Sequence, residues 1–391
     1  MIYDFDKIVD RRNSGSYKWD GMKRLFGRDD LLPFWVADMD FATPKPVTDA
    51  FKQRLEHPVF GYKARGESYC RAILKWLAVR HGWVVKREWL TFCPPGVVQS
   101  IHMLVNLLSE PGDEIILQTP AYNPLINVVT GNNRKLLRNE LKLTGNRYEI
   151  DFDDLTRKIS GKTRLMILCS PHNPSGRVWK EDELGKLTDI CIDNNIKIIS
   201  DEIHADFVYK GHRHIPLGSL SDKARNNAIT CLSAGKTFNI SGLQQAVLVI
   251  PDEATRHLFE EARDVAQINL DNIFSEVATE AAYTHCGEWL DQLITYLQCN
   301  VEYLSDYLGK NLPEVNVIKP EGTYLVWLDM RELGKSSREI NDLLVNRAGV
   351  ALYEGKEFGE KREGFFRMNI ACPRTLLSDG LKRISDALKN Y

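Results

Sequence analysis

Between residues 45 and 275 the chain alternates short apolar runs with longer stretches in which apolar residues recur every three or four positions. The runs cover residues 90–93, 114–118, 164–169, 197–200, 229–232 and 246–250, and the amphipathic stretches include 45–56, 67–81 and 97–108. Several runs are apolar throughout, which is typical of parallel strands covered on both faces. Strands interleaved with helices form right-handed crossover units. We therefore expect an α/β fold.

The pattern changes near residue 275, where a long helical stretch reaches about residue 312 without a strand. Strands over 315–318, 324–328 and 365–370, with helices over 337–348 and 376–388, then predict a smaller α+β domain. A chain of 391 residues is also longer than one hydrophobic core usually supports. The predicted division is an N-terminal segment (1–45) that packs with the small domain, a large domain (46–275) and a small domain (276–391). A cleft between the two domains is the expected ligand site.

Charge and cysteine usage narrow the class of protein. The formal net charge is −2, and the lysines and arginines are scattered, which argues against a broad nucleic-acid or membrane surface. No apolar run approaches the roughly 20 residues that span a bilayer. The eight cysteines form no C-x-x-C pair, and the charged N-terminus lacks an apolar signal core. We expect a cytoplasmic protein with reduced thiols, no metal site, and neither nucleic acid nor membrane as a partner.

Lys236 lies in the sequence SAGKTFNISG, directly after the apolar run 229–232. Small residues let a ligand approach the backbone, and Ser233 supplies a hydroxyl to an anion. A partly desolvated lysine in such a turn can lose its proton and form an imine. Taken alone, the stretch is equally well interpreted as a loop with a surface lysine.

A carboxylate and an imidazole follow the run 197–200, at Asp201 and His204. Ligands of open α/β sheets bind beyond the carboxyl ends of the strands. Asp201 there can keep a pyridine nitrogen protonated by pairing with it, and His204 can lie near the ring. On its own this pattern is more often a helix N-cap.

Three further turns follow apolar runs. Asn173, in SPHNPSG, can donate an amide hydrogen to a phenolic oxygen, although Asn before Pro is often only turn chemistry. Val97 and Val98 open a helix after PPG, where free amides form a phosphate seat. Tyr122 can stack on a flat ring or be an ordinary packed aromatic. No one of these signals decides the function, but independent loops would rarely combine them along one sheet.

Together these residues give the chain a strong resemblance to a known family. It resembles the fold-type-I pyridoxal-phosphate enzymes, the aspartate aminotransferase superfamily, and within it the MalY/PatB-type cystathionine β-lyase branch. The most specific motifs are DRR (10–12), KWD (18–20), PFWVADMDF (33–41), VFGY (59–62), DEIH (201–204), KTFN (236–239) and FRMNIACPR (366–374). The resemblance covers nearly the whole chain, and it implies a mostly parallel sheet of seven strands between helices.

The resemblance implies pyridoxal 5′-phosphate as cofactor and a role for each candidate residue. Lys236 would hold the cofactor through its amine and act as general base at the substrate α-carbon. Asp201 would pair with the ring nitrogen, and Asn173 and His204 would lie near the phenolic oxygen. The remaining cofactor contacts are stacking by Tyr122 and phosphate binding by Ser233, Val97 and Val98.

The same resemblance implies a homodimer with shared active sites, in which Tyr62 reaches the phosphate of the neighbouring subunit. Arg367 would bind the α-carboxylate of an amino-acid substrate through two parallel hydrogen bonds. Two departures concern the pocket: Gly235 stands where relatives more often have Ser, and residues 353–355 read Tyr-Glu-Gly instead of an apolar residue or Asn, then Pro and Gly.

The expected activity is cleavage of cystathionine or cysteine S-conjugates by α,β-elimination to pyruvate, ammonia and a thiol. This expectation rests on the branch resemblance, since no single residue is needed by a lyase alone. Transamination, as in class I/II aminotransferases, uses the same lysine, carboxylate and arginine. A regulatory protein with secondary catalysis is a further alternative, disfavoured because every expected cofactor group is present.

Overall fold

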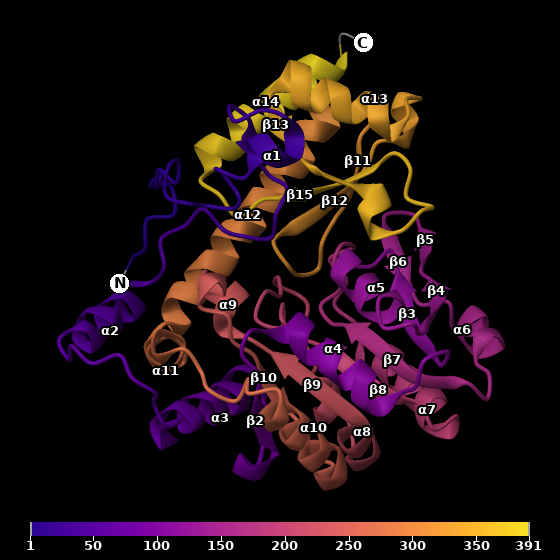
Figure 1. Cartoon of the computed structure of the whole chain (residues 1–391). Coiled ribbons are helices and arrows are strands. Elements are labelled where there is room, and N and C mark those ends of the chain that lie inside the picture. The colour runs from indigo at the N-terminus through magenta and orange to yellow at the C-terminus, as the bar shows by residue number, and fades with distance from the viewer. Residues whose placement is uncertain (1, 390–391) are drawn as a thin grey trace.

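The apolar runs of the first two thirds of the chain form one seven-stranded sheet in the computed structural model, which describes residues 2–389 (Figure 1). Its order is β2-β10-β9-β8-β7-β3-β4. The strands are β2 (Leu90–Phe92), β3 (Glu114–Thr119), β4 (Lys135–Glu140), β7 (Thr163–Cys169), β8 (Lys197–Asp201), β9 (Ala228–Leu232) and β10 (Val247–Val249). Only β10 runs against its neighbours, so the mostly parallel α/β fold is confirmed.

Helices cover both faces of this sheet, which explains why its strands are apolar throughout. Ile115 and Leu117 pack with α4 and α5 on one face, whereas Ile116 packs with α7 on the other. The helices of this region are α2 (Lys45–Leu55), α3 (Glu67–His81), α4 (Val97–Leu108), α5 (Asn123–Thr130), α6 (Phe152–Lys158), α7 (Glu181–Asp193), α8 (Asp222–Asn227), α9 (Ala234–Thr237) and α10 (Glu253–Val265).

A second, antiparallel sheet of four strands follows, in the order β11-β12-β15-β14. Its strands are β11 (Asn316–Ile318), β12 (Leu325–Asp329), β14 (Tyr353–Glu354) and β15 (Phe365–Asn369). It packs with α11 (Ile273–His285), α12 (Gly287–Asn311), α13 (Ser337–Asp342) and α14 (Arg374–Lys389). The long predicted helix is thus two helices that meet at Cys286, and the helix predicted over 337–348 continues beyond α13 as a π-helical segment, Leu343–Ala348.

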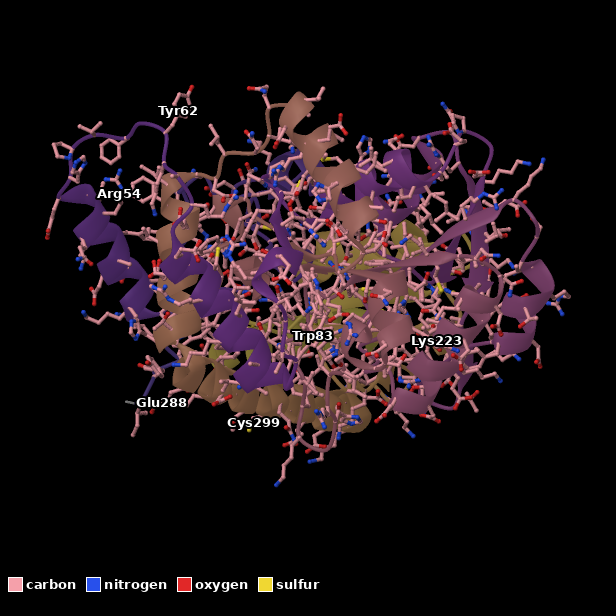
Figure 2. All side chains as sticks on the ribbon, turned by 90° about the horizontal axis from the view of Figure 1, so that it is seen from below. Arg54, Tyr62, Trp83, Lys223, Glu288 and Cys299 are labelled. Carbon is pink, nitrogen blue, oxygen red and sulfur yellow. The ribbon has the colours of Figure 1, made fainter. Side chains whose placement is uncertain are left out.

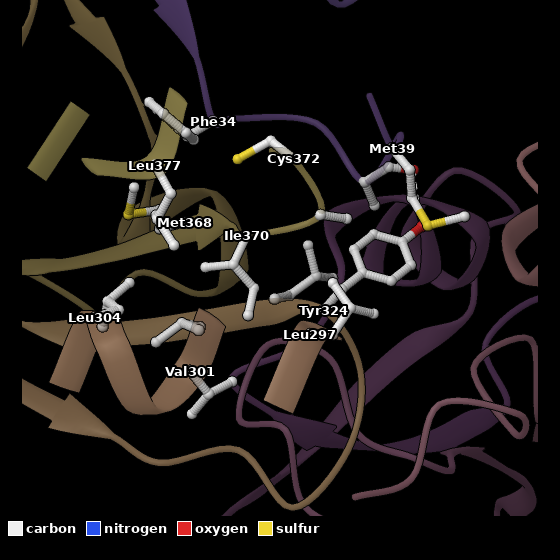
Figure 3. Packing of buried hydrophobic residues seen from close by; sticks show 14 of the residues in the cluster. Phe34, Met39, Leu297, Val301, Leu304, Tyr324, Met368, Ile370, Cys372 and Leu377 are labelled. Atoms are coloured by element: carbon white, nitrogen blue, oxygen red, sulfur yellow. Dashed lines mark hydrogen bonds between the residues drawn. The ribbon is translucent and has the colours of Figure 1, made fainter. Parts of the chain in front are cut away.

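The N-terminal segment lies against this second sheet (Figure 1). After α1 (Met22–Phe26), β1 (Leu32–Pro33) pairs in parallel with β13 (Val350–Ala351). Phe34 and Met39 enter the same apolar cluster as Ile370 and Leu377 (Figure 3). A Cβ at Gly380 would lie 2.5 Å from the Phe34 ring, so only glycine allows this close approach.

Three strands have weaker signals in the sequence. β4 was not predicted because Lys135 and Arg138 interrupt its apolar pattern, and the hairpin of β5 (Lys142–Thr144) and β6 (Arg147–Glu149) is mostly polar. No helix within residues 2–389 has both the length and the apolar character needed to cross a bilayer. The domain limits at residues 45 and 275 stay predictions.

Candidate active site

The candidate residues that follow the strands converge at one edge of the seven-stranded sheet. β3, β7, β8 and β9 are parallel, and β2 points the same way because both β2 and β9 are antiparallel to β10. Their carboxyl ends open on a cavity of about 410 Å³. Eight of the predicted residues line it: Val97, Val98, Tyr122, Asn173, Asp201, His204, Ser233 and Lys236.

Lys236 lies in the single turn of α9, which begins where the buried strand β9 ends. Ser233 caps this turn, because its hydroxyl accepts a hydrogen bond of 3.0 Å from the amide of Gly235. Loss of hydration lowers the pKa of Lys236; the negative charge of Asp38 opposes this, and the positive charge of Arg367 adds to it. Its Nζ donates a 2.6 Å hydrogen bond to the carbonyl of Ala37. An amine with a lowered pKa is suited to attack a carbonyl carbon.

Asp201 is a buried carboxylate at the end of β8. Burial raises its pKa to about 6, although the amide of Ile203 donates a 3.2 Å hydrogen bond that opposes the rise. Within residues 2–389 no lysine, arginine or histidine forms an ion pair with it. A ligand with a cationic ring nitrogen would supply the missing counter-charge.

His204 lies in the same wall of the cavity and is buried. Burial, and next the positive charges of Lys236 and Arg367, lower its pKa to about 3, so the imidazole is neutral at physiological pH. Its ring meets that of Tyr324 edge to face at 5.8 Å, while Nδ1 has no hydrogen-bond partner in the described part of the chain. A buried ring nitrogen without a partner favours a ligand atom in that place.

The first turn of α4 faces the cavity through Val97 and Val98. Gly96 precedes it at φ 143°, ψ −177°, a conformation that is essentially restricted to glycine. The first amides of a helix have no partner inside the helix, and the helix dipole adds positive potential there. The turn is therefore suited to hold a phosphate.

The hydroxyl of Ser233 differs from the expectation in one respect. It donates a 2.8 Å hydrogen bond to the carbonyl of Gln245, so its hydrogen is already used within the chain. Ser241, which the sequence analysis missed, also lines the cavity. Its Oγ lies 3.4 Å from where a Cβ of Gly235 would be, so it places a hydroxyl beside the position where the expected serine is lacking. Ser241 belongs to the stretch SAGKTFNISG, but its approach to Gly235 depends on the fold of the residues between them and is not marked by the sequence pattern.

Arg367 lies on β15 and is buried, 1% exposed. Its NH1 and NH2 donate to Asn173 Oδ1 at 3.0 Å and to the carbonyl of Trp35 at 2.8 Å, and Nε has no partner among the described residues. The guanidinium lies over the rings of Tyr353 and Phe358, at 5.1 and 4.9 Å. Burial lowers its pKa to about 10. No carboxylate of residues 2–389 pairs with it, which suits the binding of a carboxylate-bearing ligand.

Tyr62 is the candidate that a single chain does not bring to the cavity. It lies in the loop between α2 and α3, is 95% exposed, and projects from the edge of the molecule (Figure 2). Its expected contact with a neighbouring subunit therefore stays a prediction.

The remaining groups fit pyridoxal 5′-phosphate as a set. The cofactor carries an aldehyde for the Lys236 amine, a ring nitrogen for Asp201 and a phosphate for the first turn of α4. His204 and Asn173 lie in the wall beside these groups, where a phenolic oxygen needs hydrogen-bond donors. The unpaired carboxylate of Asp201 is the part of this set that a ligand satisfies most directly.

The fold and this cavity define a cofactor-dependent enzyme of amino-acid chemistry, and the family model described as aminotransferase class I and II matches residues 29–384. The chain belongs to this family. It is 42% identical to the cystathionine beta-lyase PatB of Bacillus subtilis (strain 168), over 98% of this chain and 100% of that protein.

Solved structures agree with the sequence comparison. The PLP-bound putative aminotransferase from Clostridium difficile 630 has a TM-score of 0.97 and 45% identity, covering 99% of this chain and 100% of that one. Cystalysin from Treponema denticola, whose crystal structure contains pyridoxal 5′-phosphate, has a TM-score of 0.96 and 34% identity over 100% of both chains.

Proposed function

We propose that the protein is a pyridoxal-phosphate-dependent carbon–sulfur β-lyase that cleaves cystathionine or a cysteine S-conjugate. The observation that carries the proposal is a lysine amine of lowered pKa in one cavity with a buried, unpaired carboxylate, Lys236 and Asp201. The identity of 42% with a cystathionine beta-lyase along nearly the full chain supports this choice of reaction.

Each group of the cavity has one task in binding. The amides of Val97 and Val98 hold the phosphate, and the ring of Tyr122 packs on the cofactor ring. The Asp201 carboxylate keeps the ring nitrogen protonated. Arg367 then binds the substrate α-carboxylate, and its planar fork fixes the amino acid in one orientation. Asn173, which already accepts from Arg367, aligns the guanidinium for this contact.

The bound cofactor supplies an electron sink conjugated with the substrate nitrogen. Lys236 takes the α-proton of the substrate on Nζ, and burial, which lowers its pKa, favours the neutral amine that can accept this proton. The carbon–sulfur bond at the β-carbon breaks, and the sulfur leaves with the bond's electron pair and is protonated. One water completes the balance: a thioether amino acid and water give a thiol, pyruvate and ammonia.

Incubation of the purified protein with L-cystathionine, without any added keto acid, tests the proposal. Pyruvate and free thiol released in equal amounts over many turnovers are expected. Transamination is the alternative within the same family. A reaction that stops after one turnover, with the absorbance of pyridoxamine phosphate, and resumes only when a keto acid is added would overturn the lyase assignment.

We also propose that the protein is a homodimer of the cytoplasm. Phe60 and Tyr62 are 53% and 95% exposed in one loop. Exposed aromatic surface of this kind favours contact with another protein surface, here that of a second copy of the chain. The eight cysteines are free thiols, seven of them buried, as suits a reducing compartment. Light scattering of the wild type and of a Phe60→Asp variant tests the dimer. A monomeric wild type would overturn it.

A further inference from the structure

The backbone of residues 34–41 lies between the element that carries Lys236 and the strand that carries Arg367. Its backbone carbonyls accept hydrogen bonds from side chains on both of these elements. Arg367 donates to the carbonyl of Trp35 at 2.8 Å, and Lys236 donates to that of Ala37 at 2.6 Å. The 34–41 segment therefore links the two residues that hold substrate and cofactor in the proposed function.

Asn369 binds this segment on both sides of Ala37. Its Nδ2 donates two hydrogen bonds of 2.7 Å, one to the carbonyl of Val36 and one to that of Asp38. Its Oδ1 accepts a 2.8 Å hydrogen bond from the amide of Ala371, which fixes which end of the side-chain amide points at the segment. Asn369 is 1% exposed, so water does not replace these bonds easily.

Arg367 and Asn369 are two positions apart on β15, so their side chains leave the strand on the same face. They bind the carbonyls of Trp35, Val36 and Asp38, and the carbonyl of Ala37 is the one left for Lys236. Among the described residues, the hydroxyl of Tyr324 is the only other group that donates a hydrogen bond to that oxygen, at 3.4 Å.

We propose that Asn369 is a positioning residue for Lys236: by fixing the peptide groups on both sides of Ala37, it holds the Ala37 carbonyl as the acceptor that orients the free lysine amine. The inference rests on the proposed function, because it concerns the amine that attaches the cofactor. Asn369 does not itself line the cavity, and it acts through the backbone carbonyls of Val36 and Asp38.

The charged groups around Lys236 come from several elements and are the same in each variant below. Asp38 on the 34–41 segment and Asp201 on β8 favour the ammonium form, whereas Arg367 on β15 disfavours it. His204 is neutral through its own lowered pKa. The Ala37 carbonyl, like Asp38 and Asp201, favours the ammonium form of Lys236, because a carbonyl oxygen forms a stronger hydrogen bond with an ammonium than with an amine.

The full-length, cofactor-free protein tests the inference. Pyridoxal 5′-phosphate is mixed with it over a series of pH values, and the rate of imine formation is followed by absorbance. The midpoint of this rate profile reports the proton equilibrium of the free Lys236 amine. In Asn369→Ala the midpoint is expected to move about one pH unit lower, because a hydrogen bond to a charged group is lost.

Asn300→Ala is a matched control. Asn300 is also fully buried and its Nδ2 also donates to two carbonyls two residues apart, those of Ile370 and Cys372, each at 3.0 Å. Both variants should unfold at a lower temperature than the wild type, but Asn300→Ala should keep the wild-type midpoint. A midpoint unchanged in Asn369→Ala, or shifted equally in Asn300→Ala, overturns the inference.

A milder variant covers the case in which Asn369→Ala does not fold. Asn369→Ser keeps one donor and should shift the midpoint in the same direction by a smaller amount, and an unshifted midpoint again overturns the inference. A wild-type protein that forms no imine at all would instead overturn the proposed function. The two failures are therefore distinguishable.

Discussion

The hydroxyl of Thr237, the residue after Lys236, donates a 2.7 Å hydrogen bond to the buried carboxylate of Asp206. The other oxygen of Asp206 contacts the ring nitrogen of His81 at 2.9 Å and accepts from Trp76 at 3.0 Å. Burial alone would raise the pKa of Asp206, but the hydrogen bond and charge of His81, with the bond from Thr237, hold it below the ordinary value. The turn that carries Lys236 is therefore held in place by the buried hydrogen bonds of Asp206.

Replacing Asp206 by Ala should lower the free energy of unfolding by about 3–5 kcal/mol at pH 7, because three buried donors lose their acceptor. Thr237→Val, which removes a single hydrogen bond, should cost only about 1 kcal/mol. Denaturant unfolding measures both. Because the folded-state pKa is depressed, this stability is present above the unfolded-state value near 3.9 and is lost as the pH falls through the folded-state pKa. A difference between wild type and Asp206→Ala that persists unchanged at lower pH would contradict this account.

Replacing Lys236 by Ala should abolish the visible absorbance of the bound cofactor and lower turnover by about 10²–10⁴-fold or more, since both attachment and proton transfer are lost. Spectra and pyruvate release measure the two effects. The surface variant Lys223→Ala should keep both (Figure 2). Borohydride reduction and peptide mapping should label residue 236, and a label at another lysine would contradict the assignment.

Replacing Asp201 by Asn should stabilise the cofactor-free protein above pH 6 while weakening cofactor binding. Burial raises the pKa of Asp201 from 3.8 to about 6, so the folded state holds its proton more tightly than the unfolded state does. Wild-type stability therefore falls as the pH rises from about 4 to 6, by up to about 3 kcal/mol, and the asparagine variant avoids this loss.

Thermal unfolding of the wild type and of Asp201→Asn at pH 5 and pH 8, with and without pyridoxal 5′-phosphate, measures both the stability difference and its change on cofactor binding. The cofactor should stabilise the wild type more than the variant by about 2 kcal/mol, because the variant has no charge for the ring nitrogen. Equal stabilisation of the two proteins would show that the carboxylate does not pair with the cofactor.

Replacing Arg367 by Lys should lower kcat/KM for cystathionine about 30–100-fold, mostly through KM, because an ammonium cannot form the two parallel hydrogen bonds. Arg374→Lys is the matched control. Arg374 also has a side-chain contact with an asparagine, a 2.7 Å bond to Asn300, but it lies on α14 and not in the site. A larger loss in the control than in Arg367→Lys would refute the assigned role.

The parts of the fold and site that could be predicted from the sequence are those marked by a recurring pattern, an apolar run followed by a polar side chain. The positions of Asp201 and Lys236 were recognisable because Asp201 ends, and the turn of Lys236 follows, an unbroken apolar run, and parallel strands bring such positions to one edge of the sheet. The strand β4 was missed because its two apolar residues, Leu136 and Leu137, are adjacent and flanked by Lys135 and Arg138, so it has neither an unbroken apolar run nor an alternating pattern.

The contacts made by backbone atoms were beyond the sequence. The carbonyl of Ala37 becomes part of the site only because residues about 200 and 330 positions away, Lys236 and Asn369, bind the same short segment. No local pattern marks a carbonyl for such use. Ser241 was missed for a different reason: it lies in the quoted stretch SAGKTFNISG, but its position in the cavity depends on the turn after α9.

The hydrogen bond between Arg367 and Trp35 joins residues 332 positions apart. One of its partners is made early in translation and the other near the end, so a nascent chain cannot form this contact until most of the polypeptide has been synthesised. Until then, apolar residues such as Phe34 lack the partners on β15 and α14 against which they pack in the folded protein. Slow synthesis or premature release should therefore leave an apolar amino-terminal segment exposed to solvent and prone to aggregation. We expect folding in the cell to depend on chaperones for this reason.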